Sequence, residues 1–245
     1  MKINYKDIGI HKNYLYEVLV TTLTKDKDKT IPNAACMGIR LVDDFIIKMT
    51  PYPNTTTYKN VKENGLASIN FVDNIFLYSL ASLKDPNSRI GLKEFPIEYY
   101  GYYDFINEKG IKALIKESND FDKIKFPYIK QAWAIAFCET IEENQITKEN
   151  SLGKLELSEF KLKTYSIIKK RESFKVFNRA ENLILEILIL ATRLKLAKER
   201  KNQQLFHSIH NRIIDYMQII KRFTKNDEVI KSLDLISKFV KVLEV

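Results

Sequence analysis

Small and polar residues at the ends of apolar segments are the parts of this 245-residue sequence best suited to bind a ligand. Residues 31–40, IPNAACMGIR, combine an asparagine amide with small side chains, and residues 53–60, PNTTTYKN, contain three consecutive threonines. Asn70 lies near the end of the next apolar segment, in ASINFV. Hydroxyls, amides and backbone N–H groups at a helix start donate hydrogen bonds to phosphates. The three segments therefore indicate a site for a phosphorylated cofactor.

The segment from Thr55 to Gly65 predicts a short helix, because hydroxyl residues stand near its start and a glycine stands at its end. The N-terminus of such a helix presents backbone N–H groups that favour an anion. An ordinary threonine cap is the alternative interpretation of the same pattern.

The elements that must position these residues are mostly short strands, since apolar segments rich in Val, Ile, Phe and Tyr recur between polar breaks. Strand follows strand without regular helical crossovers, which favours a closed or nearly closed antiparallel barrel over a parallel sheet. Asp43 and Asp44 predict a tight hairpin. The expected strands cover residues 15–22, 34–42, 45–49, 66–72, 75–80, 97–103 and 132–141, with a final edge strand over 155–168.

From Ser173 onward the apolar positions follow a helical period. The pattern predicts one helix around residues 176–194, a second near 204–223 and a third near 227–243, the last capped by Asn226. We therefore expect a barrel domain over residues 1–170. A helical segment over residues 171–245 is expected to pack on that barrel or on a second protomer.

The net charge of +9 belongs to the C-terminal part of the chain. Residues 1–150 contain 20 Lys and Arg against 20 Asp and Glu, whereas residues 151–245 contain 20 against 11. A basic helical region of this kind is a solvated face or a surface for nucleic acid or an acidic partner. No zinc-finger spacing, RNP-like motif or Gly-rich phosphate loop accompanies the charge, which makes nucleic acid the weaker interpretation.

Several classes of protein are disfavoured by the sequence. The most apolar long segment, residues 183–196, contains Glu186 and Arg193, and the N-terminus lacks the pattern of a signal peptide, so we expect a cytoplasmic protein without a membrane span.

Cys36 and Cys138 have no metal-ligand spacing, and His207 and His210 lack further ligands nearby, so no metal site is expected. Hydrolytic motifs are absent, which leaves any catalysis to a cofactor.

Three segments, in order, resemble a family of archaeal and bacterial proteins of unknown function that is similar to the FMN-binding split barrel of flavin reductases. Residues 33–38, NAACMG, resemble the family's Asn-Ala-Ala-Pro-Met-Gly segment, with Cys36 in place of the proline. Residues 57–60, TYKN, are followed by Asn70, and residues 177–194 are similar to the Phe-Asn-Arg-Ala and Ala-Thr-Arg-Leu segments. A cysteine at position 36 adds backbone freedom and an N–H donor that proline lacks.

The resemblance implies an antiparallel split β-barrel of the FMN-binding type, followed by a C-terminal helical segment. It also implies a homodimer and places residues 33–37 along the flavin ring. The threonines and Asn60 would bind the phosphate and ribityl end, and Tyr58 would stack or belong to the core. One of two arginines would meet the phosphate, while the other pairs with a carboxylate. The implied FMN-binding residues are Asn33, Ala34, Ala35, Cys36, Met37, Thr55, Thr56, Thr57, Tyr58, Asn60, Asn70, Arg179 and Arg193.

Two functional interpretations follow from the sequence. In the first, the chain is an FMN-binding protein or FMN-dependent oxidoreductase that takes electrons from a reduced nicotinamide or another donor. In the second, it is a non-catalytic interaction module that binds nucleic acid or an acidic partner through its basic C-terminal helices. FMN affinity and the salt dependence of binding separate the two.

Overall fold

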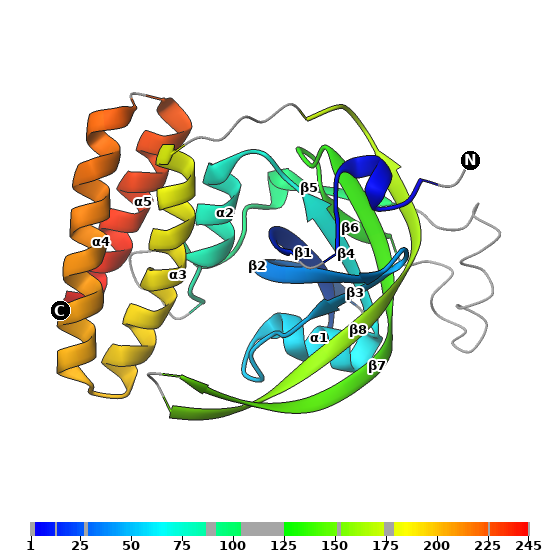
Figure 1. Ribbon diagram of the computed structural model, residues 1–245, viewed down its shortest axis with the longest axis horizontal. Coiled ribbons are helices and arrows are strands. Elements are labelled where there is room, and N and C mark those ends of the chain that lie inside the picture. Colours follow the sequence, from blue (N-terminus) through cyan, green and yellow to red (C-terminus); the bar gives the residue numbers. More distant parts are fainter. Residues whose placement is uncertain are drawn as a thin grey trace. The chain divides into compact units, whose positions relative to one another are not determined.

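The computed structural model describes residues 3–12, 14–26, 29–86, 92–103, 125–150, 153–173, 179–224 and 226–244 (Figure 1). Contacts divide the chain into two compact units. The barrel unit comprises residues 1–72 and 96–173, and the helical unit comprises residues 73–95 and 174–245. In sequence order, residues 73–95 thus interrupt the barrel unit.

Six antiparallel strands close into a barrel in the order β1-β2-β3-β8-β7-β4 (Figure 1). The predicted antiparallel split barrel followed by C-terminal helices is confirmed. The final strand, expected at an edge, instead pairs with both β3 and β7, because closure of the barrel leaves it no free side there. The strands are β1 (Leu15–Asp26), β2 (Lys29–Asp43), β3 (Ile46–Met49), β4 (Leu66–Phe71), β7 (Ala134–Asn150) and β8 (Gly153–Lys169).

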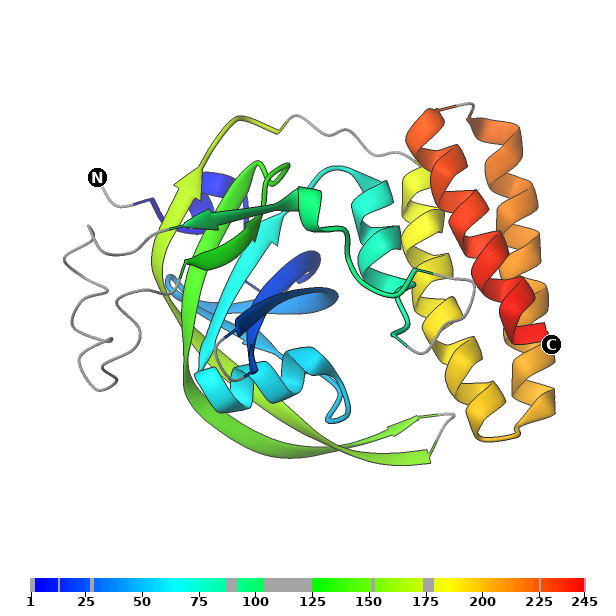
Figure 2. The same cartoon turned by 180° about the vertical axis from the view of Figure 1, so that it is seen from behind.

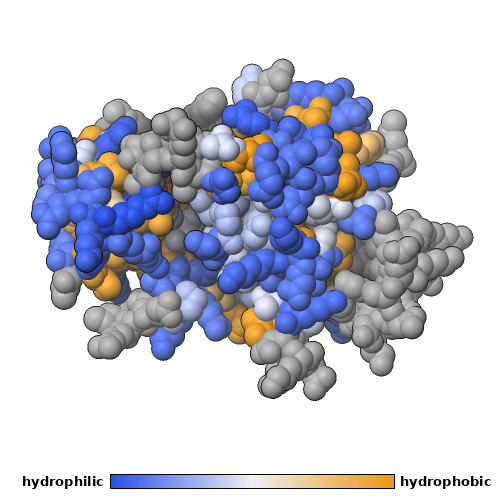
Figure 3. All heavy atoms as spheres, turned by 90° about the horizontal axis from the view of Figure 1, so that it is seen from below, coloured by the Kyte–Doolittle hydropathy of each residue, from blue (hydrophilic) through white to orange (hydrophobic). Residues whose placement is uncertain are grey.

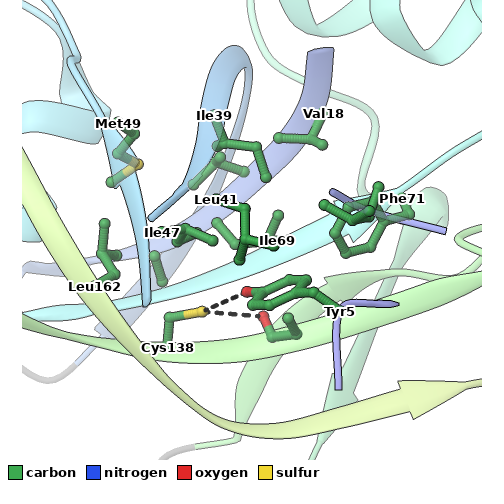
Figure 4. Close-up of a cluster of buried hydrophobic side chains, with 14 of the residues drawn as sticks. Tyr5, Val18, Ile39, Leu41, Ile47, Met49, Ile69, Phe71, Cys138 and Leu162 are labelled. Carbon is green, nitrogen blue, oxygen red and sulfur yellow. Dashed lines mark hydrogen bonds between the residues drawn. The ribbon is translucent and has the colours of Figure 1, made fainter. Parts of the chain in front are cut away.

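The barrel interior is filled by side chains. Successive residues of a strand point to opposite faces, and the inward members of each strand form one buried apolar cluster (Figure 4). This cluster contains Val18, Val20, Ile39, Leu41, Ile47, Met49, Ile69, Phe71, Phe160 and Leu162. The interior is a packed core, so it leaves no lumen for a ligand of flavin size.

Tyr5, next to the short 3-10 helix η1 (Lys6–Ile8), is fully buried in this core. Its hydroxyl lies 3.9 Å from the sulfur of Cys138 (Figure 4). The same hydroxyl lies 2.6 Å from Thr164 Oγ1. Burial raises the pKa of the Cys138 thiol to about 11. Cys138 is therefore a protonated, structural thiol at neutral pH.

A two-stranded sheet of β5 (Tyr100–Tyr103) and β6 (Phe126–Ile129) covers part of the outer barrel wall (Figure 2). β6 lies against β1 and β4, where the hydroxyls of Thr21 and Ser68 both donate to the carbonyl of Pro127, at 2.7 and 2.9 Å. The expected strand over residues 97–103 is shorter, because residues 97–99 form the 3-10 helix η2 (Ile97–Tyr99).

The predicted helix between Thr55 and Gly65 is confirmed as α1 (Thr56–Asn64), which lies across one end of the barrel (Figure 1). The Thr55 side chain caps it, and Gly65 ends it with a φ of 69°, a left-handed conformation that glycine adopts without steric cost. α1 packs against β1, β2 and β4.

The helical unit contains α2 (Ile75–Ser82), α3 (Arg179–Glu199), α4 (Gln203–Phe223) and α5 (Asp227–Glu244). The three C-terminal helices and the Asn226 cap are as predicted. The predicted strand over residues 75–80 is wrong, since this segment is α2, capped by Asn74. Its apolar run is too short to show a period, and α2 is buried against α3 and α5. No helix in the described part of the chain is long and apolar enough to cross a membrane.

Candidate functional site

The residues predicted to lie along the flavin ring alternate between the two faces of β2. The Asn33 side chain points into the barrel, where its amide donates to Thr57 Oγ1. Met37 packs against the core cluster. By the strand period of two, Ala34 and Cys36 point to the outer wall. Of the five predicted residues, only these two thus turn outward. Ala34 is fully buried there and Cys36 is half-buried, so Cys36 is the one that a ring could meet.

Asn33, Thr57 and Asn60 come together with Thr22 on the inner side of the barrel wall. The Asn33 amide donates to Thr57 Oγ1 at 3.1 Å and to Thr22 Oγ1 at 3.3 Å. The Asn60 amide donates to the same Thr22 hydroxyl at 2.9 Å, and the Thr24 hydroxyl donates to Asn60 Oδ1 at 3.0 Å. This inner polar cluster fastens α1 to the β1–β2 hairpin. Thr22 and Thr24 carry no local sequence signal for this role, because their partners come from other elements.

Thr55 and Thr56 are exposed at the start of α1. The Thr55 hydroxyl donates to the carbonyl of Tyr52 at 2.7 Å and accepts from the backbone N–H of Tyr58 at 3.2 Å. The Tyr58 ring lies edge-on to Phe160, with centroids 5.8 Å apart. Tyr58 therefore packs against the core, and the exposed hydroxyl of Thr56 faces solvent at the helix start.

Asn70 lies on the outer side of β4 and is fully buried under β6. Its Oδ1 accepts from the backbone N–H of Ile129 at 2.8 Å. Its amide lies within hydrogen-bonding distance of the Leu19 carbonyl at 2.9 Å and of Thr21 Oγ1 at 3.2 Å. Asn70 thus fixes β6 to the barrel wall, a role consistent with its position at the end of a strand.

The outer wall of the β1–β2 hairpin carries a strip of small residues, Ala34, Cys36 and Gly38, which we call the β2 strip. Glu17 pairs with Gly38 in the register, and the Cys36 thiol donates to Glu17 Oε2 at 3.5 Å. A Cβ at Gly38 would come within 3.0 Å of Leu15 Cδ1 and 3.5 Å of Glu17 Oε1. The flexible side chains of Leu15 and Glu17 therefore lie close over the backbone at Gly38. Glu17 carries no local sequence signal for this site, because only strand pairing brings it next to Gly38 and Cys36.

The two predicted arginines belong to the helical unit. Arg179 begins α3, and its side chain lies outside the described residues. Arg193 is exposed on the same helix.

His207 and His210 do not assemble a metal site. His210 Nε2 lies 2.6 Å from Glu244 Oε1, and its ring stacks on Phe206. Among the described residues, no group of three His, Cys, Asp or Glu side chains could hold a metal ion.

Known proteins match this chain over most of its length. An uncharacterized protein of Methanocaldococcus jannaschii, MJ1453, is 26% identical over 206 residues, which cover 84% of this chain and 88% of that protein. The crystal structure of the FMN-bound protein MM1853 from Methanosarcina mazei superposes with a TM-score of 0.65 at 19% identity, over 96% of this chain and 98% of that one. Residues 16–166 match the N-terminal domain, and residues 178–238 the second domain, of a family described as protein of unknown function DUF447. The chain therefore belongs to the DUF447 family.

Proposed function

We propose that this protein binds FMN on the outer wall of its barrel, with the flavin ring over the β2 strip. The observation that carries the proposal is the run of small residues on the outer side of β2, where Cys36 and Gly38 are half-buried beside Glu17 and the fully buried Ala34 continues the strip. A flat tricyclic ring must approach the backbone closely, and only small side chains permit this. The MM1853 protein, which has the same fold, is FMN-bound.

The packed interior supports an outer site. Tyr5, Phe160 and Leu162 are buried within the barrel at 1% exposure or less, which leaves the ring no space there. The donor set also fits: backbone groups of β2 suit the polar edge of the ring, and Glu17 adds an acceptor for a ring N–H.

The start of α1 suits the FMN phosphate. Thr56 and the backbone N–H groups of the first turn are hydrogen-bond donors at an exposed helix start. Thr55, the exposed residue that caps this helix, lies beside them. Thr57 and Asn60, which the family resemblance also assigns to this end of the cofactor, hold α1 in position through the inner polar cluster. The family resemblance alone assigns Arg179 or Arg193, both of the helical unit, to the phosphate.

The same proposal includes an oxidoreductase activity. When bound, FMN supplies electron or hydride transfer from a reduced nicotinamide or another donor. The residues of the β2 strip would orient the ring, and the Cys36–Glu17 pair would hold a proton next to it. The proposed location is the cytoplasm, where Cys36 and Cys138 stay reduced.

A homodimer is also part of the proposal. Tyr14 is 62% exposed and Leu15 is 55% exposed, and Leu15 adjoins Gly38 in the β2 strip. A second copy would remove these apolar side chains from water beside the flavin. Light scattering of the purified protein measures the oligomeric state directly.

The first test is the visible absorption spectrum of freshly purified protein, followed by denaturation and identification of the released chromophore. We expect a flavin spectrum and released FMN, or stoichiometric uptake of added FMN by colourless protein. A colourless protein that fails to take up FMN would overturn the proposal.

A further inference from the structure

Three cations gather on the barrel unit where the ends of β6 and β8 meet: Lys130, Lys170 and Arg171, here called the cation cluster. All three are exposed. The backbone N–H groups of Lys170 and Arg171 both donate to the carbonyl of Trp133, at 2.8 and 3.3 Å, and the N–H of Lys130 donates to the carbonyl of Tyr99 at 2.9 Å. Three separate segments of the chain are thus tied together at this point.

The lysine ammonium groups are held in place by carbonyl oxygens. Lys130 Nζ donates to the carbonyl of Glu98 at 3.0 Å, and Lys170 Nζ donates to the carbonyl of Lys130 at 2.5 Å. Neither lysine pairs with a carboxylate within the described part of the chain, and the adjacent Glu172 pairs with Lys169 at 2.6 Å. Each ammonium has further donors to offer an anion.

The ammonium group of Lys170 lies over the ring of Tyr128. Lys170 Nζ lies 5.4 Å from the centre of the Tyr128 ring, and that ring lies across Gly101. A Cβ at Gly101 would approach Tyr128 Cζ to 2.4 Å, so only glycine allows the ring this position. Partial desolvation, followed by the nearby charge of Arg171, lowers the pKa of Lys170.

The cation cluster and the β2 strip lie on one outer wall. Leu19 of β1 pairs with Cys36 on one side and with Asn70 on the other, so about 10 Å separates Cys36 from Asn70 at the usual strand spacing. Asn70 then binds the N–H of Ile129, the residue before Lys130. The separation between Cys36 and Asn70 is within the length of a nucleotide.

We infer that the cation cluster binds the phosphate group of a nucleotide whose ring lies at the β2 strip. This inference rests on the proposed function. Two sources share this chemistry, the pyrophosphate of a dinucleotide electron donor and the phosphate of FMN. Because the start of α1 already suits the FMN phosphate, the dinucleotide is the expected source.

The test uses the full chain and the variants Lys130→Gln and Lys170→Gln, which remove charge but keep a hydrogen-bond donor. Lys163→Gln is the matched control, because Lys163 is an exposed lysine of β8, the strand that ends just before Lys170. Fluorescence titration gives the dissociation constants of FMN and riboflavin. Calorimetry of the FMN-loaded protein gives those of NAD+ and NADP+, which cannot reduce the flavin.

We expect each cluster variant to weaken dinucleotide binding about tenfold, because it loses one charged contact. Its dissociation constants for FMN and riboflavin should stay unchanged, and Lys163→Gln should bind all ligands like the wild type. Weaker binding of FMN but not of riboflavin would support the same site with the FMN phosphate as its ligand. Unchanged binding of both nucleotides would overturn the inference.

A flavin-independent measurement separates this inference from the proposed function. Inorganic pyrophosphate should raise the melting temperature of the wild-type protein and of Lys163→Gln, and should raise it less in the two cluster variants. This result would hold even if the protein bound no flavin. Equal stabilisation of all four proteins would count against the cation cluster.

Discussion

The side-chain amide of Asn33 donates a hydrogen bond to Thr57 Oγ1 at 3.1 Å, which joins β2 to α1 across 24 residues of sequence. Both side chains are buried. The same amide and that of Asn60 converge on the Thr22 hydroxyl. This cluster sets where the exposed start of α1 stands relative to the outer wall of β2.

Replacing Thr57 with Val should destabilise the fold, because it leaves the buried Asn33 amide without one acceptor. The expected loss is about 1–3 kcal/mol of unfolding free energy, measured by urea denaturation followed through Trp133, the only tryptophan in the sequence. The exposed Thr56→Val variant is the control: it should keep its stability and instead bind FMN more weakly. If Thr57→Val kept full stability but lost FMN affinity, the Thr57 hydroxyl would be a direct ligand.

Replacing Gly38 with Leu should block the β2 strip. The nearest atom to a new Cβ is the flexible end of Leu15, at 3.0 Å, so the barrel can accommodate the change. The larger side chain should occupy the space of the flavin ring and weaken FMN binding by about tenfold or more, as measured by fluorescence titration.

Gly38→Ala is the graded companion to that variant and should weaken FMN binding less. Circular dichroism checks that both variants fold. Full FMN affinity in a folded Gly38→Leu protein would place the ring elsewhere.

Stability should fall in alkaline solution because of Cys138. Its folded pKa, about 11, lies above the ordinary value of 9.0, so the folded protein holds this proton more tightly than the unfolded chain does. The contribution is complete below an ordinary thiol pKa and is lost as pH rises toward the folded value. It is about 3 kcal/mol, since the pKa rises from 9.0 to about 11 and each tenfold change in proton affinity corresponds to about 1.4 kcal/mol.

Urea denaturation over this pH range measures the loss. Cys138→Ala should flatten the profile where the thiol titrates, whereas Cys36→Ala, at the half-buried cysteine, should leave it unchanged. Tyr5, whose pKa burial also raises, adds a further decline at still higher pH in all variants. A wild-type profile that matches Cys138→Ala would exclude the thiol as the cause.

Replacing Asn70 with Leu should loosen β6 from the barrel wall. The substitution removes the acceptor for the Ile129 N–H and the donor to the Leu19 carbonyl, all of which are buried. We expect a loss of about 2–3 kcal/mol and faster hydrogen exchange at the Ile129 amide. Unchanged exchange at this amide in a folded variant would mean that β6 is held by other contacts.

Much of the fold could be predicted from the sequence because the relevant signals are local. Alternating apolar residues predicted the barrel strands, and the Thr55 cap and Gly65 predicted both ends of α1. The sequence predicts a strand over residues 75–80, IFLYSL, because a segment of six residues is too short to show a clear period. Their helix is stabilised by burial against α3 and α5, which are about a hundred residues or more away in sequence.

For the site, the sequence by itself determined which chemical groups are present. These are the mostly small residues over 34–38, the threonine hydroxyls over 55–57, and the side-chain amides of Asn60 and Asn70. Only the tertiary structure decided which of these groups remain available to a ligand. Strand pairing turned Asn33 inward onto Thr57 and brought Glu17 beside Cys36. The physical reason is that a polar group can bind a ligand only when no other group of the protein already forms its hydrogen bonds. Those competing partners come from segments that are distant in sequence.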